Sequence, residues 1–385
     1  MTVEQNISRL QYLLELYNIS GKELSSIISK GLKNPLTNED IFLREIKVNH
    51  LKRIDKVFNK GLPYYLDPAP PETSRDASIF FRKEKFNSDL NIGARKIVNE
   101  FEEIKISLFA ISKLSDLNTD RLFRLYKLSD DPREVADEIR NRLYPDFTRN
   151  LKEFLKSLIS KFAEYNVLVF EFVETWNKKE KANINGFFLG PDVIVLKRQQ
   201  TSFRREIFTL IHELGHFLIN EEEIEKLEYQ QIGRKDVSAI EKWCNEFAFQ
   251  FLAGEYGKLL DELELADAVN DYHFDFIEQV SKKTNLSQIA LFTRLLYNNK
   301  ISQYNYNKVK SDLDERYRLK LEDEKRRIEI EKQKGIPQRG SAPKPIQSPL
   351  FISTIQAAFA EGILNEYEVC KKLKIKPEKL EKYIS

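Results

Sequence analysis

Cysteine is scarce in this sequence, with Cys244 and Cys370 the only two among 385 residues. So few cysteines exclude a secreted scaffold held together by disulfides. The N-terminus MTVEQNISRL lacks the basic and then apolar pattern of a signal peptide. No apolar run approaches the roughly 18 residues that a membrane-spanning helix needs. Together these absences predict a cytoplasmic protein.

An excess of charge of either sign is also missing. The 62 basic and 60 acidic side chains leave a formal net charge of +2. The chain as a whole therefore has no field that attracts nucleic acid or an anionic membrane, and any such contact needs a local patch. With 41% hydrophobic residues, a chain of this length can bury the cores of two or three domains.

Strand patterns are confined to one part of the sequence. Between residues 166 and 196, the runs YNVLVFEF, INGFFLG and DVIVL are rich in β-branched and aromatic residues, which predicts a small sheet. Elsewhere the apolar spacing is typical of helices. The predicted fold class is therefore α+β, dominated by helices. Prolines in DPAPPETSRD, residues 67–76, end a small N-terminal helical domain.

Histidine is rare as well, yet two of the four histidines stand in FTLIHELGHFLI, residues 208–219. His212 and His216 lie on one face of a helix and can bind the same zinc ion, with Glu213 beside a metal-bound water. Such a carboxylate can take the proton of a water that zinc has acidified and deliver it to a leaving amine. The alternative is an ordinary amphipathic helix, but scattered histidines produce this string by chance only roughly once in a few hundred sequences. The motif predicts a peptidase site.

A third zinc ligand is needed, because a catalytic zinc usually has three protein ligands and one water. Glu241 is a candidate, since it lies on the next strongly periodic helix, where a loop and an antiparallel return can bring it back to His216. The same residue could instead close a capping box with Ser238. Glu246 and Glu255 are the competing candidates, and spacing alone favours Glu241 only modestly.

HELGHFL followed by EKWCNEFAFQFL resembles the ImmA/IrrE family of metallopeptidases. The resemblance implies a zincin-like core with a small sheet, zinc as the cofactor and Glu241 as the third zinc ligand. It also implies that Asn245 lies beside that glutamate, one turn later. The strand that contains Gly186 and Phe187 would then offer its edge to an extended peptide substrate.

The segment HLKRIDKVFNKGLPYYLDPAPPE, residues 50–72, resembles the end of the Xre-type helix-turn-helix domain that often precedes such peptidases. This implies a small all-α N-terminal domain and DNA as a possible partner, with Lys22, Lys30, Lys33 and Lys47 near phosphates. However, Pro35 interrupts residues 29–46, where a recognition helix would lie.

The expected organisation follows from these patterns. It comprises a helix-turn-helix-like domain at 1–66, a linker at 67–82, an ImmA/IrrE-like zinc metallopeptidase domain at 83–300, a charged helix at 301–334, a linker at 335–345 and a C-terminal helical tail at 346–385.

Two functions compete. In the first, the protein is a zinc endopeptidase that cleaves a specific regulator, such as a repressor or an antitoxin-like protein. In the second, it is a DNA-binding regulator or a toxin-neutralising antitoxin whose zinc domain only binds. Glu213 favours the enzyme, because a structural zinc site has no use for a carboxylate beside an open position. His273 could donate to a developing oxyanion, although a lone histidine among aromatic residues is more often structural.

Overall fold

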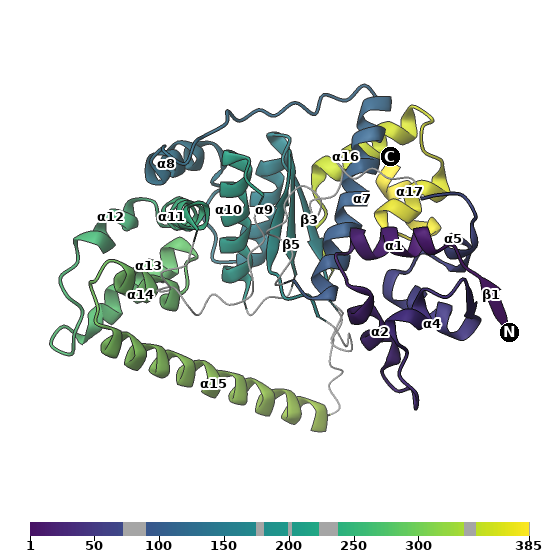
Figure 1. Ribbon diagram of the computed structural model, residues 1–385. Coiled ribbons are helices and arrows are strands. Elements are labelled where there is room, and N and C mark those ends of the chain that lie inside the picture. Colours follow the sequence, from purple (N-terminus) through teal and green to yellow (C-terminus); the bar gives the residue numbers. More distant parts are fainter. Residues whose placement is uncertain (72–89, 175–180, 199–201, 223–237, 335–343, 385) are drawn as a thin grey trace. The chain divides into compact units, whose positions relative to one another are not determined.

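A computed structural model describes residues 1–71, 90–174, 181–198, 202–222, 238–334 and 344–384 (Figure 1). The chain divides into two compact units. The first comprises Met1–Ala110 with Thr175–Ile184, and the second comprises Ile111–Glu174 with Asn185–Ser385. Helices dominate both units, and a three-stranded sheet lies where the sequence predicts strands. The predicted α+β class, dominated by helices, is confirmed.

The first unit is built from short helices around a small apolar core. Its helices are α1 (Ile7–Leu16), α2 (Gly21–Ser29), α3 (Asn38–Ile41), α4 (Val48–Phe58), α5 (Leu62–Leu66) and most of α7 (Ile92–Leu114). An antiparallel pair also occurs in this unit, β1 (Thr2–Glu4) with β2 (Glu45–Lys47). The sequence does not indicate this pair, because strands of three residues are too short to show a period of two.

The segment expected to hold a recognition helix contains little helix. Within residues 29–46, the four-residue α3 is the helix that forms, with Thr37 and Asp40 as its capping box. α2 ends at Ser29, and Gly31 follows its C-cap with a left-handed φ of 81°. Pro35 then restricts the residue before it and cannot donate a backbone hydrogen bond, so no helix spans this segment. A single helical turn offers few side chains to a DNA groove.

The second unit is organised around the three-stranded sheet. Its strands are β3 (Leu168–Phe172), β4 (Gly186–Leu189) and β5 (Val193–Lys197), in the order β3-β5-β4. β3 is parallel to β5, and β4 is antiparallel to β5, with Phe187 opposite Val195. Among the described strands, β4 is therefore an edge strand. All four of its residues are buried.

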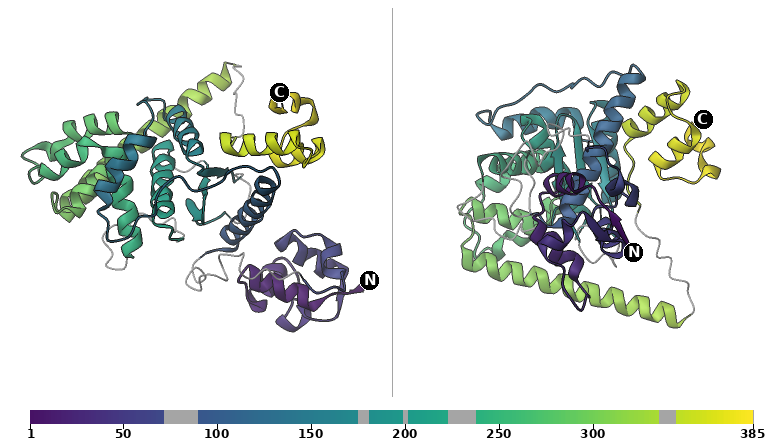
Figure 2. Two further views of the ribbon diagram at one scale, coloured as in Figure 1. Left: turned by 90° about the horizontal axis from the view of Figure 1, so that it is seen from above. Right: turned by 45° about the vertical axis from the view of Figure 1, so that its right-hand side comes forward.

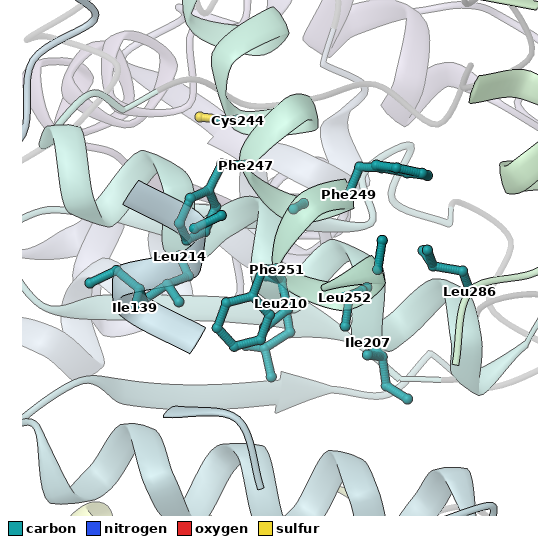
Figure 3. Packing of buried hydrophobic residues seen from close by; sticks show 14 of the residues in the cluster. Ile139, Ile207, Leu210, Leu214, Cys244, Phe247, Phe249, Phe251, Leu252 and Leu286 are labelled. Atoms are coloured by element: carbon teal, nitrogen blue, oxygen red, sulfur yellow. The ribbon is translucent and has the colours of Figure 1, made fainter. Parts of the chain in front are cut away.

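Helices pack on this sheet and on one another to form the main core. They are α8 (Pro132–Leu143), α9 (Leu151–Glu164), α10 (Phe203–Ile219), α11 (Ala239–Ala253), α12 (Glu255–Glu262), α13 (Phe274–Thr284) and α14 (Gln288–Tyr297). α9 and α10 pack against the sheet, and α11 packs against α8 and α10 (Figures 1 and 2). Figure 3 shows Phe247 and Phe251 of α11 beside Leu210 and Leu214 of α10. In the described part of the chain, no helix is long and apolar enough to cross a membrane.

The C-terminal part adds a long exposed helix and a small helical tail. α15 (Gln303–Gln333) has Val309 as its buried residue and carries ion pairs between residues three or four apart, such as those of Arg318 with Glu315 and Glu322. The tail consists of α16 (Pro349–Ala360), α17 (Glu366–Leu373) and α18 (Glu381–Ile384). α16 packs on α9, and the ring of Phe351 lies 5.3 Å from that of Phe170 on β3.

Arginine side chains cap the C-terminal ends of several helices in this chain. Each donates to backbone carbonyls that have no partner within the helix. The pairs are Arg95 on α1, Arg53 on α2, Arg121 on α10, Arg140 on α11 and Arg204 on α13. A positive charge at this end also interacts favourably with the helix dipole.

A buried charge cluster joins the sheet to the tail. Glu171 on β3 accepts a hydrogen bond from the backbone N–H of Ile346 at 2.6 Å and lies 3.8 Å from Arg198 Nε. Arg198 is already paired with Glu206, so one guanidinium serves two carboxylates. Burial is the main cause that raises the pKa of Glu171 to about 7.

We expect Glu171→Gln to change how stability depends on pH. Because the pKa of Glu171 is higher in the folded chain than the ordinary value of 4.5, the folded state binds more protons between about pH 4.5 and 7, and stability falls as the pH rises through this window. The full effect is up to roughly 3 kcal/mol. Urea unfolding of both proteins at pH 5 and pH 8 measures it, and identical pH dependence in the two would contradict the prediction.

Candidate metal centre

The helix that carries the HELGH motif is almost completely buried in its second half. Ser202 caps the start of α10 by accepting a hydrogen bond from the backbone N–H of Arg205, and Asn220 ends it in a left-handed conformation with φ of 54°. Between these ends, His212, Glu213 and His216 are at most 1% exposed. Three polar side chains buried in a core helix need specific partners.

α11 approaches this part of α10 closely, and a glycine makes the approach possible. A Cβ atom added to Gly215 would lie 3.1 Å from Cys244 Sγ and 3.2 Å from Cys244 Cα. Gly215 therefore allows the close approach of another helix. Ser238 caps α11 by accepting the backbone N–H of Glu241 at 3.1 Å, so the first turn of α11 presents the Glu241 carboxylate to the histidines.

Three metal-binding side chains converge between the two helices. His212 Nε2 and His216 Nε2 lie 3.1 Å apart, and the Glu241 carboxylate oxygens lie 3.2 Å from His212 Nε2 and 3.4 Å from His216 Nε2. In a tetrahedral zinc site with bonds of about 2.0–2.1 Å, neighbouring ligand atoms are roughly 3.3 Å apart. The donor set therefore fits a metal ion of this size.

The protonation of these groups suits metal binding. His216 Nδ1 lies 2.9 Å from the carbonyl oxygen of Glu221, so Nδ1 carries the proton and donates it, which leaves the Nε2 lone pair for the metal. Burial opposes ionisation of Glu241, but in the metal-free chain the charge and hydrogen bonds of the two imidazoles, when they are protonated, outweigh burial and lower the pKa of this carboxyl below its usual range. Among the described residues, His212 Nδ1 has no hydrogen-bond partner.

Comparison with known families agrees with this geometry. Residues 163–266 match the family described as the IrrE N-terminal-like domain, Peptidase_M78. This segment is an IrrE N-terminal-like domain. The chain therefore carries a metallopeptidase domain of the HExxH type, and the resemblance inferred from the sequence is confirmed for these residues. No curated protein and no solved structure matches the chain significantly.

The IrrE N-terminal-like domain covers 104 of the 385 residues. It contains the three-stranded sheet, α10, α11 and α12, and thus all three converging residues. The match does not include residues 1–162, so the expected helix-turn-helix domain remains a prediction.

The other glutamates considered as ligands have different environments. Glu246, also in the IrrE N-terminal-like domain, pairs with Arg133 at 2.6 Å and forms two contacts with Arg294. Glu255 is exposed at the start of α12. Among the described residues, Glu241 is the carboxylate that joins the two histidines in a metal-binding group.

Glu213 lies beside the edge strand of the sheet in the IrrE N-terminal-like domain. It follows His212 by one residue and therefore points about 100° further round the helix. A Cβ atom on Gly186 would lie 3.2 Å from Glu213 Cγ and 2.7 Å from Thr209 Cγ2. Glycine at position 186 therefore lets β4 pack this close to the side chains of Thr209 and Glu213. The neighbouring Phe187 is completely buried.

The two remaining candidate residues lie on α11 and after α12. Asn245 is partly buried on α11, one turn after Glu241. His273 Nε2 lies 3.2 Å from the carbonyl oxygen of Glu264 and 3.2 Å from Asn270 Nδ2. These contacts hold the loop before α13 and favour the structural interpretation of His273.

Two functional groups near the metal site, the Glu221 carbonyl and the Arg121 guanidinium, are not indicated by the sequence. The carbonyl of Glu221 orients His216, but every residue has a carbonyl, so no residue type signals it. Arg121, which precedes Phe217 by 96 residues in the sequence, donates a hydrogen bond to the Phe217 carbonyl at the end of α10. A surface arginine and a capping arginine look the same in a sequence, because the difference lies in a contact between distant segments.

Proposed function

We propose that the protein is a zinc-dependent endopeptidase that cleaves a specific regulator protein, such as a repressor or an antitoxin-like protein, and so controls gene expression or a stress response. The proposal rests on the convergence of His212, His216 and Glu241 at tetrahedral ligand spacing, with a buried Glu213 on the helix that carries the two histidines. Two imidazoles and one carboxylate form a typical donor set of a catalytic zinc site.

The chain's own residues have distinct roles in this proposal. When bound, zinc would acidify a water molecule and polarise the scissile carbonyl. Glu213 accepts the water's proton and returns a proton to the leaving amine. Glu213 follows His212 by one residue and packs against β4. It therefore lies close to the metal site but is not one of the ligands.

The proposed substrate chain lies along β4. An extended peptide can add to an edge strand through backbone hydrogen bonds, and Gly186 at the start of β4 packs directly over Glu213. Because Phe187 is completely buried, the peptide would have to displace the groups that cover this edge. Aligned with Gly186 and Phe187, it would then pass close to the catalytic carboxylate. Asn245 on α11 would contact the substrate or support Glu241.

DNA binding has less support than proteolysis. The segment 29–46 forms a single helical turn rather than a recognition helix, and the net charge of +2 gives no general attraction to nucleic acid. A binding module without catalysis is also less well supported, because a structural zinc site has no use for a carboxylate directly after its first histidine ligand.

The test compares wild type with Glu213→Gln in cells of the source organism. We expect the wild type to yield cleaved target under an inducing condition, and the variant to retain the intact target, because only the proton acceptor is lost. Affinity capture with mass spectrometry identifies the target and its cleavage state. Equal phenotypes, with the target intact under every inducing condition, would favour the binding module instead.

A further inference from the structure

A segment that precedes α8 caps the C-terminal end of α10, the helix that carries His212, Glu213 and His216. We call residues 121–130 the strap (Figure 1). Arg121 Nη2 donates to the carbonyl oxygens of Phe217 at 2.6 Å and Leu218 at 3.2 Å. The backbone N–H of Tyr126 donates to the same Leu218 carbonyl at 3.1 Å. The strap thus donates three hydrogen bonds to carbonyls in the last turn of α10, where the regular i to i+4 pattern of the helix ends.

The strap also reaches the second helix of the metal centre. The indole Nε1 of Trp243 donates to the carbonyl oxygen of Asp130 at 2.8 Å. Trp243 is two residues after Glu241 on α11. The strap is therefore hydrogen-bonded to both helices that supply the metal-binding side chains. Its contacts lie close to His216 on α10 and close to Glu241 on α11.

The turn that Arg121 holds also orients His216. The backbone N–H of Glu221 donates to the carbonyl of His216 at 3.0 Å, and that of Asn220 donates to the carbonyl of Phe217 at 3.1 Å. This is the hydrogen-bond pattern of a Schellman motif, with Asn220 in the left-handed conformation. The turn folds the chain back, so that the Glu221 carbonyl lies 2.9 Å from His216 Nδ1.

We propose that Arg121 is a positioning residue, which holds this turn so that the imidazole of His216 keeps the orientation and the tautomer needed to bind metal. The inference deepens the proposed function and rests on it. The guanidinium is well placed for this role, because it lies 3.9 Å from the centre of the Phe217 ring and also donates to the Phe123 carbonyl. Without Arg121, the Phe217 and Leu218 carbonyls lose a charged donor, and the turn loosens.

The chain contains a matched control for this arginine. Arg140 on α8 donates to the carbonyls of Phe251 and Leu252 at the end of α11, and its guanidinium lies 3.5 Å from the centre of the Tyr144 ring. Phe251 is ten residues after Glu241, which is roughly 15 Å along the helix. Arg140 therefore has the same structural role as Arg121, but at the end of a helix that is far from the metal ligands.

The experiment compares Arg121→Ala with Arg140→Ala in the full chain. Zinc affinity is measured by competition with a chelator, and thermal melting of the metal-free proteins measures stability. We expect both variants to melt at lower temperature, and only Arg121→Ala to bind zinc about 10- to 100-fold more weakly, as for other groups that orient a metal ligand. Equal zinc affinities of the two variants would overturn the inference.

Two further outcomes have clear meanings. If the alanine variants do not fold, Arg121→Lys and Arg140→Lys replace them, because lysine keeps the charge but cannot bridge two carbonyls with a planar group. Weaker zinc binding confined to Arg121→Lys supports the inference, and equal binding overturns it. Failure of the wild type to bind zinc would instead overturn the proposed function, and this inference with it.

Discussion

Glu213→Gln should leave zinc bound and reduce the rate of peptide hydrolysis by about 10²- to 10⁴-fold, the range typical of the loss of a general base. The variant keeps His212, His216 and Glu241, so the metal ligands are unchanged. Glutamine has nearly the same shape as glutamate but cannot accept the water's proton. The expected loss is therefore in kcat, while substrate binding is maintained.

The measurement is the cleavage rate of the captured target by wild type and variant at equal zinc content. His273→Ala is a suitable control, because His273 contacts Glu264 and Asn270 in a loop, and we expect its rate to stay close to that of wild type. A Glu213→Gln protein that cleaves at the wild-type rate with zinc bound would remove Glu213 from the mechanism.

Glu241→Gln should weaken zinc affinity by orders of magnitude. The Glu241 carboxylate lies within 3.4 Å of both imidazoles, and an amide is a far poorer zinc ligand than a carboxylate. The substitution leaves the backbone N–H of Glu241 bonded to Ser238, so the cap of α11 is retained. The loss of affinity therefore reports the ligand role alone.

Ser238→Ala is the complementary variant. It removes the cap and should cost about 1 kcal/mol of stability, but it leaves the carboxylate in place and zinc affinity close to that of wild type. Metal titration combined with thermal melting separates the two roles. Normal zinc affinity in Glu241→Gln would show that the chain binds metal without this carboxylate.

The part of the site that can be predicted from the sequence depends on local geometry. His212 and His216 are four residues apart, and helical periodicity alone places them on one face. Glu241 is different, because the distance between two helices does not follow from their spacing in the chain. Family resemblance favours it, and the contact of Gly215 with Cys244 explains how α11 comes close enough.

Contacts between distant segments could not be predicted. The strap, the Glu171 cluster and the ion pairs of Glu246 each join residues that are far apart in the sequence, and no local pattern marks them. Local chemistry was informative in another place. Pro35 indicated that residues 29–46 would not form a long helix, and α3 has four residues.

The metal content of the purified wild type, measured by inductively coupled plasma mass spectrometry beside that of His212→Ala, tests the central claim most directly. Since His212, His216 and Glu241 form the metal-binding group found in the described part of the chain, we expect about one zinc ion per wild-type chain and none in the variant. Zinc at the wild-type level in a folded His212→Ala protein, or a wild type that binds no metal at all, would contradict the assignment.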